Sequence, residues 1–141
     1  MTRAVGTIVL ALLTGCGEVV LAAATITDWS SVGAHALLFA FLAGPLLFLA
    51  LMAWRRRSHA TRTKVLFAVA LLCALGGLSA LAWRAYRFHT VPEAKFERSD
   101  VGIAVPLVQW GAILLVWLWL LVVESREKRA ASAPGAPNVT K

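Results

Sequence analysis

The sequence predicts an all-α, polytopic membrane protein, a bundle of four transmembrane helices. Of its 141 residues, 60% are hydrophobic and 15% are charged, and the mean hydropathy is +0.76. This apolar content is well above that of a water-soluble domain. The charged residues stand in short clusters between long apolar runs. The net charge of +7 is therefore typical of membrane flanks and does not indicate a nucleic-acid partner.

The expected transmembrane helices are the four apolar runs, at about residues 4–26, 33–54, 65–88 and 103–123. Each run reaches the roughly 20 residues that a helix needs to cross about 30 Å of hydrocarbon. Helices satisfy their own backbone hydrogen bonds in lipid, and no run shows the alternation of a barrel strand. We expect one transmembrane domain over 1–130. The Pro- and Gly-containing segment 131–141 is expected to be a disordered cytoplasmic tail.

The distribution of Lys and Arg predicts the orientation. The side that holds both termini carries ten basic residues, Arg3, Arg55, Arg56, Arg57, Arg62, Lys64, Arg126, Lys128, Arg129 and Lys141. The other side carries four, Arg84, Arg87, Lys95 and Arg98, balanced by Asp28, Glu93, Glu97 and Asp100. Because basic loops stay in the cytoplasm, both termini should be cytoplasmic. The short loops and the Ala- and Leu-rich composition favour a bacterial inner (plasma) membrane.

The first run contains a carboxylate, Glu18, well inside the apolar stretch. An ionised acid there costs about 2.5 kcal/mol or more, so the side chain should face protein. Thr14 and Ala22 lie one helical turn away on the same face, which favours a packing seam. Two interpretations stay open: a hydrogen-bonded structural carboxyl at a helix contact, or a site for a proton or cation.

Three polar residues on the other runs are candidate partners for Glu18. His35 and Gln109 enter the second and fourth runs from the outer side, and Arg84 lies about one turn from the outer end of the third. We expect Glu18, His35, Gln109 and Arg84 to form an intramembrane polar cluster.

Small residues on the second and third runs predict further close contacts between helices, at Ala40, Gly44, Gly77 and Ala80. On the fourth run, Trp110 and Trp117 are seven residues apart and share one face. We expect that face to contact lipid or another membrane subunit.

Residues 1–16 resemble a bacterial lipoprotein signal. They end in a sequence of the lipobox type, Leu13, Thr14, Gly15 and Cys16. The resemblance implies cleavage and lipidation at Cys16. The apolar run, however, continues to Ile26 and is long enough to remain a transmembrane helix. Both outcomes stay open.

Cofactor and catalytic signals are weak in this sequence. His35 and His89 are the minimum pair for a haem b with two histidine ligands. Cys16 and Cys73 both lie in apolar runs, so no cysteine-based metal site is expected. No nucleophile stands with a base, and no glycine-rich phosphate loop occurs, so the sequence does not favour catalysis.

Three hypotheses of function follow. The first is a non-catalytic accessory or structural subunit of a larger inner-membrane complex, or a homo-oligomer. The second is a small proton-coupled transporter that uses Glu18. The third is a redox subunit that holds haem through His35 and His89.

Overall fold

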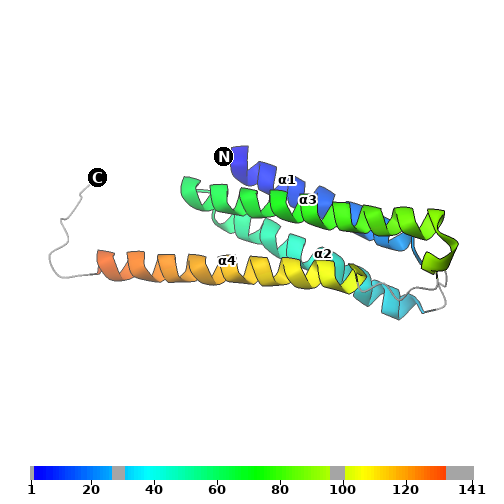
Figure 1. Ribbon diagram of the computed structural model, residues 1–141. Helices are drawn as coiled ribbons and strands as arrows, with labels where there is room; N and C mark the ends of the chain where they lie inside the picture. Colours follow the sequence, from blue (N-terminus) through cyan, green and yellow to red (C-terminus); the bar gives the residue numbers. More distant parts are fainter. Residues whose placement is uncertain (1, 27–30, 96–100, 133–141) are drawn as a thin grey trace.

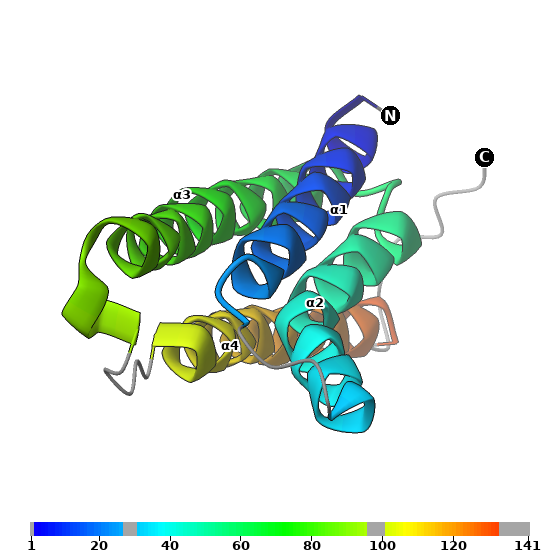
Figure 2. The same cartoon turned by 90° about the vertical axis from the view of Figure 1, so that its right-hand side faces the viewer.

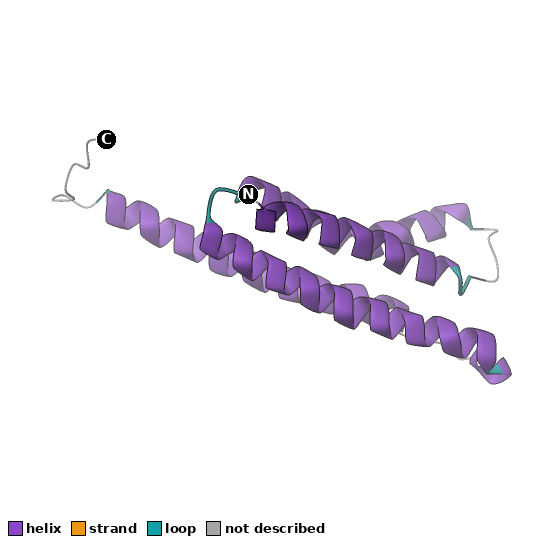
Figure 3. Ribbon diagram, turned by 90° about the horizontal axis from the view of Figure 1, so that it is seen from above, coloured by secondary structure: helices purple, strands orange, loops and turns teal. Residues whose placement is uncertain are grey.

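The computed structural model describes residues 2–26, 31–95 and 101–132, and within these ranges the chain is helical except at short turns (Figure 1). The elements are α1 (Thr2–Ala23), α2 (Val32–Arg55), α3 (Ala60–Thr90), the short 3₁₀ helix η1 (Pro92–Lys95) and α4 (Val101–Ala131). No strand occurs in the described ranges (Figure 3).

The four α-helices are long and apolar enough to cross a membrane. They contain 22, 24, 31 and 31 residues in chain order. At a rise of about 1.5 Å per residue they are roughly 33 to 46 Å long, which matches or exceeds the hydrocarbon thickness. The expected class of an all-helical chain with four membrane-length helices is confirmed.

The helix ends differ from the apolar runs. α1 ends at Ala23, where Thr25 closes a turn by donating its hydroxyl to the Ala22 carbonyl at 2.8 Å. α4 continues well beyond the apolar run, because residues 124–131 are almost all good helix formers. The expected tail therefore begins one residue inside a helix, and residues 133–141 lie outside the described ranges.

The helices are arranged as a ring, with a smaller contact between α2 and α3 (Figure 2). α1 packs against α2 and α3, and α4 packs against the same two helices, so α1 and α4 face each other across the bundle. The start of α1, the end of α4 and the connection between α2 and α3 are at the same end of the bundle, where α4 projects beyond the other helices (Figure 1). We call this the termini end and the opposite end the loop end.

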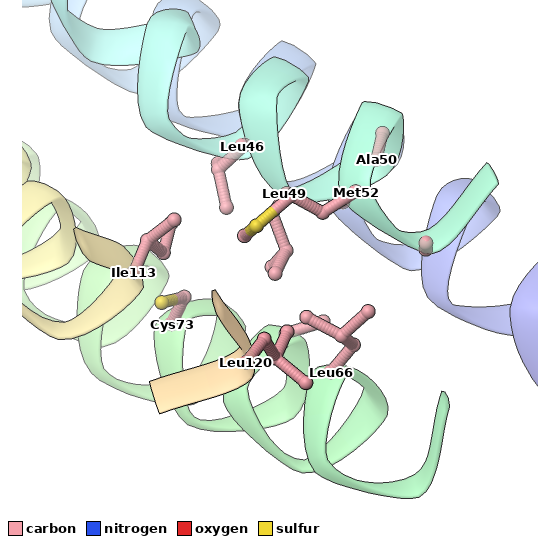
Figure 4. Close-up of a cluster of buried hydrophobic side chains, with 11 residues drawn as sticks. Leu46, Leu49, Ala50, Met52, Leu66, Cys73, Ile113 and Leu120 are labelled. Atoms are coloured by element: carbon pink, nitrogen blue, oxygen red, sulfur yellow. The ribbon is translucent and has the colours of Figure 1, made fainter. Parts of the chain in front are cut away.

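Two apolar clusters fill the interior. The larger cluster has side chains from all four helices and includes Leu49, Leu66 and Leu120, each 0% exposed (Figure 4). The smaller cluster is nearer the loop end and consists of Ala22, Leu42 and Leu81. Together they leave a segment between them, along α1, α3 and α4, where polar side chains lie.

Candidate functional site

Glu18 lies on the inner face of α1, and its side chain is completely buried. The helical period puts it on one stripe with Ala11, Thr14 and Ala22, all of which are buried. The Thr14 hydroxyl donates to the Leu10 carbonyl of its own helix at 2.7 Å. The Thr14 hydroxyl therefore donates within α1 and not to Glu18, so the hydrogen-bond donor to the carboxyl comes from another helix.

That partner is Gln109 of α4, which is 4% exposed. Its side-chain Nε2 donates to Glu18 Oε1 at 2.6 Å. The bond therefore joins the two helices that face each other across the bundle, at the level between the two apolar clusters.

Gly77 of α3 makes this bond possible. A Cβ atom added at Gly77 would collide with Glu18 Oε1 and would lie 2.6 Å from Gln109 Nε2. Real Cβ atoms essentially never come so close, so a side chain at residue 77 would force the two polar groups to shift from these positions. The close approach of α3 to the pair follows from this missing side chain.

Each partner retains one oxygen atom without a hydrogen bond. Glu18 Oε2 and Gln109 Oε1 are both buried and accept no hydrogen from the described residues. A buried acceptor without a donor costs about 1–3 kcal/mol, and more when it is charged. The geometry therefore offers two neighbouring acceptors to a proton or a small cation.

Two other members of the expected polar cluster lie away from the pair. His35 is half-buried in the first turn of α2, nearer the loop end. The Arg84 guanidinium contacts Gly102 in the first turn of α4, so that a Cβ atom there would collide with its Nη1. The structure therefore brings together Glu18 and Gln109, with Gly77 between them.

The expected packing residues have different environments. Gly77 is buried and Ala80 half-buried, whereas Ala40 is exposed. Gly44 lies under an aromatic ring, since a Cβ atom there would come within 3.1 Å of Trp110 Cζ2.

The tryptophans expected to share one face, Trp110 and Trp117, both pack against α2. Trp110 and Trp117 are half-buried, with ring centroids 6.1 and 6.3 Å from that of Phe48. The absence of a side chain at Gly44 gives the Trp110 ring its place. Trp119, at 46% exposure, is the one that points outward among these three residues.

The histidines and cysteines do not gather into a metal site. His89 is exposed at the end of α3, and its ring packs edge-on against the adjacent Phe88. Cys16 is exposed in the middle of the continuous helix α1, and Cys73 is buried; both thiols are free. Among the described residues, no three side chains of His, Cys, Asp or Glu come close enough to hold a metal ion.

A second charged site lies at the termini end, and the sequence reasoning missed it. Arg56 Nε donates to Glu124 Oε1 at 2.7 Å, and Arg62 donates to both Glu124 and Glu127. These ion pairs attach the connection between α2 and α3 to the polar part of α4. The signal was available, because Glu124 and Glu127 are three residues apart on an otherwise basic helix end.

Comparisons of this chain with protein families, with curated proteins and with solved structures found no match. Its class therefore follows from the fold itself: four candidate membrane-spanning helices indicate a multi-pass membrane protein.

Proposed function

We propose that this chain is a small membrane carrier in which Glu18 and Gln109 bind a proton or small cation during transport. One observation supports this above the others. The Glu18 carboxyl is fully buried among apolar helices, and it accepts a hydrogen bond from a neutral amide, that of Gln109. A buried carboxylate without a compensating cation is costly, so the group favours uptake of a proton or a cation.

The pair accommodates both protonation states of the carboxyl. Ionised Glu18 accepts a hydrogen bond from Gln109 Nε2. Protonated Glu18 donates its O–H to Gln109 Oε1 once the amide has turned by half a rotation, because an amide has a donor end and an acceptor end of similar shape. Gln109 thus follows the charge of Glu18 while the helices keep their places.

The orientation belongs to the same proposal. We place the termini end in the cytoplasm of a bacterial inner membrane, because ten of the 14 basic residues belong to that side. A fluorescent protein fused after Lys141 should then mature and fluoresce. An alkaline phosphatase fused at the same residue should stay inactive, and an active phosphatase would reverse the orientation.

The transport experiment uses purified protein in liposomes that enclose a pH-sensitive dye, with a potassium gradient and valinomycin to drive protons inward. Wild-type liposomes should acidify several-fold faster than empty ones. Glu18→Gln should acidify at the empty rate. Glu124→Gln is the matched control, because it removes a carboxylate at the termini end, and it should behave as wild type. Equal rates for wild type and Glu18→Gln, or for wild type and empty liposomes, would contradict the carrier.

A second candidate function is an accessory subunit of a larger membrane complex. It is favoured by α4, whose apolar membrane-length stretch has a smaller buried share of residues than that of the other three helices. Leu107, Val108, Leu115 and Trp119 are exposed along it. Extraction in mild detergent should then give a complex of defined composition, and this association should survive Glu18→Gln. A homogeneous monomer would contradict this function.

A further inference from the structure

A groove of about 420 Å³ lies between α3 and α4. Small residues line it, so the two helices do not close over one another there: Gly76, Gly77, Ala80, Ala104 and Ala112. At its rim, Leu72 and Val108 are 70% and 72% exposed. The groove therefore opens sideways, toward the surface that acyl chains cover in a membrane.

The groove is long and narrow in the direction of the helices. On α4 its lining extends from Val101 to Ala112, which corresponds to about 16 Å at the helical rise. Gln109, the buried residue with an unpartnered oxygen, lines the groove on α4, nearer to Ala112 than to Val101. All other lining residues are apolar or carry a thiol. This shape and chemistry fit a hydrocarbon chain lying parallel to the helices.

A cation lies at the loop end of the groove. Arg84 is one turn beyond Ala80 on α3, and its guanidinium contacts Gly102 at the start of α4. Arg84 is half-buried and makes no hydrogen bond or ion pair with a described residue. Gly102 belongs to the first turn of α4, whose N–H groups lack partners within their own helix. A guanidinium next to a helix N-terminus is a favourable setting for a phosphate.

We infer that this groove binds one anionic phospholipid, with its phosphate on Arg84 and an acyl chain between α3 and α4. The charge and the groove argue for the same occupant. A zwitterionic lipid offers less to a guanidinium that no described residue pairs, and a free phosphate does not fill the apolar part of the groove. This inference does not depend on the proposed transport function.

The test measures lipid binding to the purified full-length protein by native mass spectrometry, with phosphatidylglycerol, with phosphatidylcholine of the same chains, and with glycerol phosphate. Phosphatidylglycerol should bind as one molecule per chain, roughly tenfold more tightly than phosphatidylcholine, as expected for charge-assisted bonds. Glycerol phosphate should not displace it. Equal binding of the two lipids, or displacement by glycerol phosphate, would overturn the inference.

Two pairs of variants locate the binding. Arg84→Gln should weaken phosphatidylglycerol about tenfold, whereas Arg126→Gln, at the exposed termini end, should not. Gly76→Leu should fill the groove and abolish binding, because Gly76 lines the groove and a Cβ there meets open space. Gly111→Leu, equally open but outside the groove lining, is its control. Unchanged binding in Arg84→Gln or Gly76→Leu would overturn the inference. A wild-type dimer that becomes monomeric in Gly76→Leu would also overturn it, because a second copy of the chain would then occupy the groove.

Discussion

The bundle contains two carboxylate sites, one paired with cationic side chains and one without a cationic partner among the described residues. At the termini end, Glu124 and Glu127 meet two arginines, and the Glu124 and Glu127 side chains are 28% and 60% exposed. Between the apolar clusters, Glu18 is fully buried and meets a neutral amide. At the first site, arginines neutralise the carboxylates, which are partly exposed to solvent. At the second site, no cationic group in the described structure neutralises the carboxylate.

This difference separates two uses of a carboxylate. A compensated, partly exposed ion pair holds two segments together and contributes little beyond that. A buried carboxyl with a free oxygen stays responsive to a proton or cation, because each change of charge alters its free energy strongly at low dielectric. The predictions below test whether the two sites differ in this way.

The largest effect is expected at Gly77. Gly77→Ala puts a methyl group onto Glu18 Oε1 and Gln109 Nε2, so it overpacks the site and breaks the hydrogen bond. We expect a loss of about 2–4 kcal/mol in the free energy of unfolding, measured in mixed detergent micelles. Gly76→Ala is the control on the same helix and should gain about 0.5 kcal/mol, since its Cβ meets open space. Equal stabilities of the two variants would argue against the tight geometry of the pair.

The next effect concerns the pair itself. Gln109→Leu should cost about 1–3 kcal/mol of unfolding free energy, because Glu18 then has no donor. Glu18→Leu should cost a similar amount of unfolding free energy, because the buried Gln109 amide then has no acceptor. The double variant should be close to wild type, since both buried polar groups are gone. Additive losses in this double-mutant cycle would show that the two side chains are not coupled.

The smallest effect is expected at the termini end. Arg62→Met removes two ion pairs to partly exposed carboxylates and should cost about 1 kcal/mol. The loss should shrink as salt is added, because salt screens exposed charges. Arg126→Met, an exposed residue on the same polar part of α4, is the control and should change little. A loss that is large and independent of salt would make this site resemble the buried one.

The helices were largely predictable, and their ends were not. Runs of about twenty apolar residues specify membrane-length helices by hydropathy alone. Hydropathy does not specify where a helix continues into water, so the extension of α4 over 124–131 was missed. That extension depends on helix-forming residues and on their contacts with Arg56 and Arg62.

The members of the polar site were predicted, but their arrangement was not. Glu18 and Gln109 are visible as the polar residues inside apolar runs. Which of the candidates meet depends on the order of helices around the ring and on the axial level of each residue. Arg84 is seven residues beyond Gly77, about 10 Å along α3, so it lies toward the loop end, away from Glu18 and Gln109. The inward position of Trp110 depends on Gly44 of another helix, which a pattern within one helix cannot reveal.

The central claim is that Glu18 exchanges a proton, and infrared difference spectroscopy of the carboxyl stretching band tests it most directly. The purified protein is titrated between acid and alkaline pH while circular dichroism confirms that it remains helical. We predict that subtracting the Glu18→Gln spectrum from that of wild type leaves one protonated-carboxyl band, which disappears with rising pH and shifts in Gln109→Leu. Identical titrations of wild type and Glu18→Gln would contradict the account.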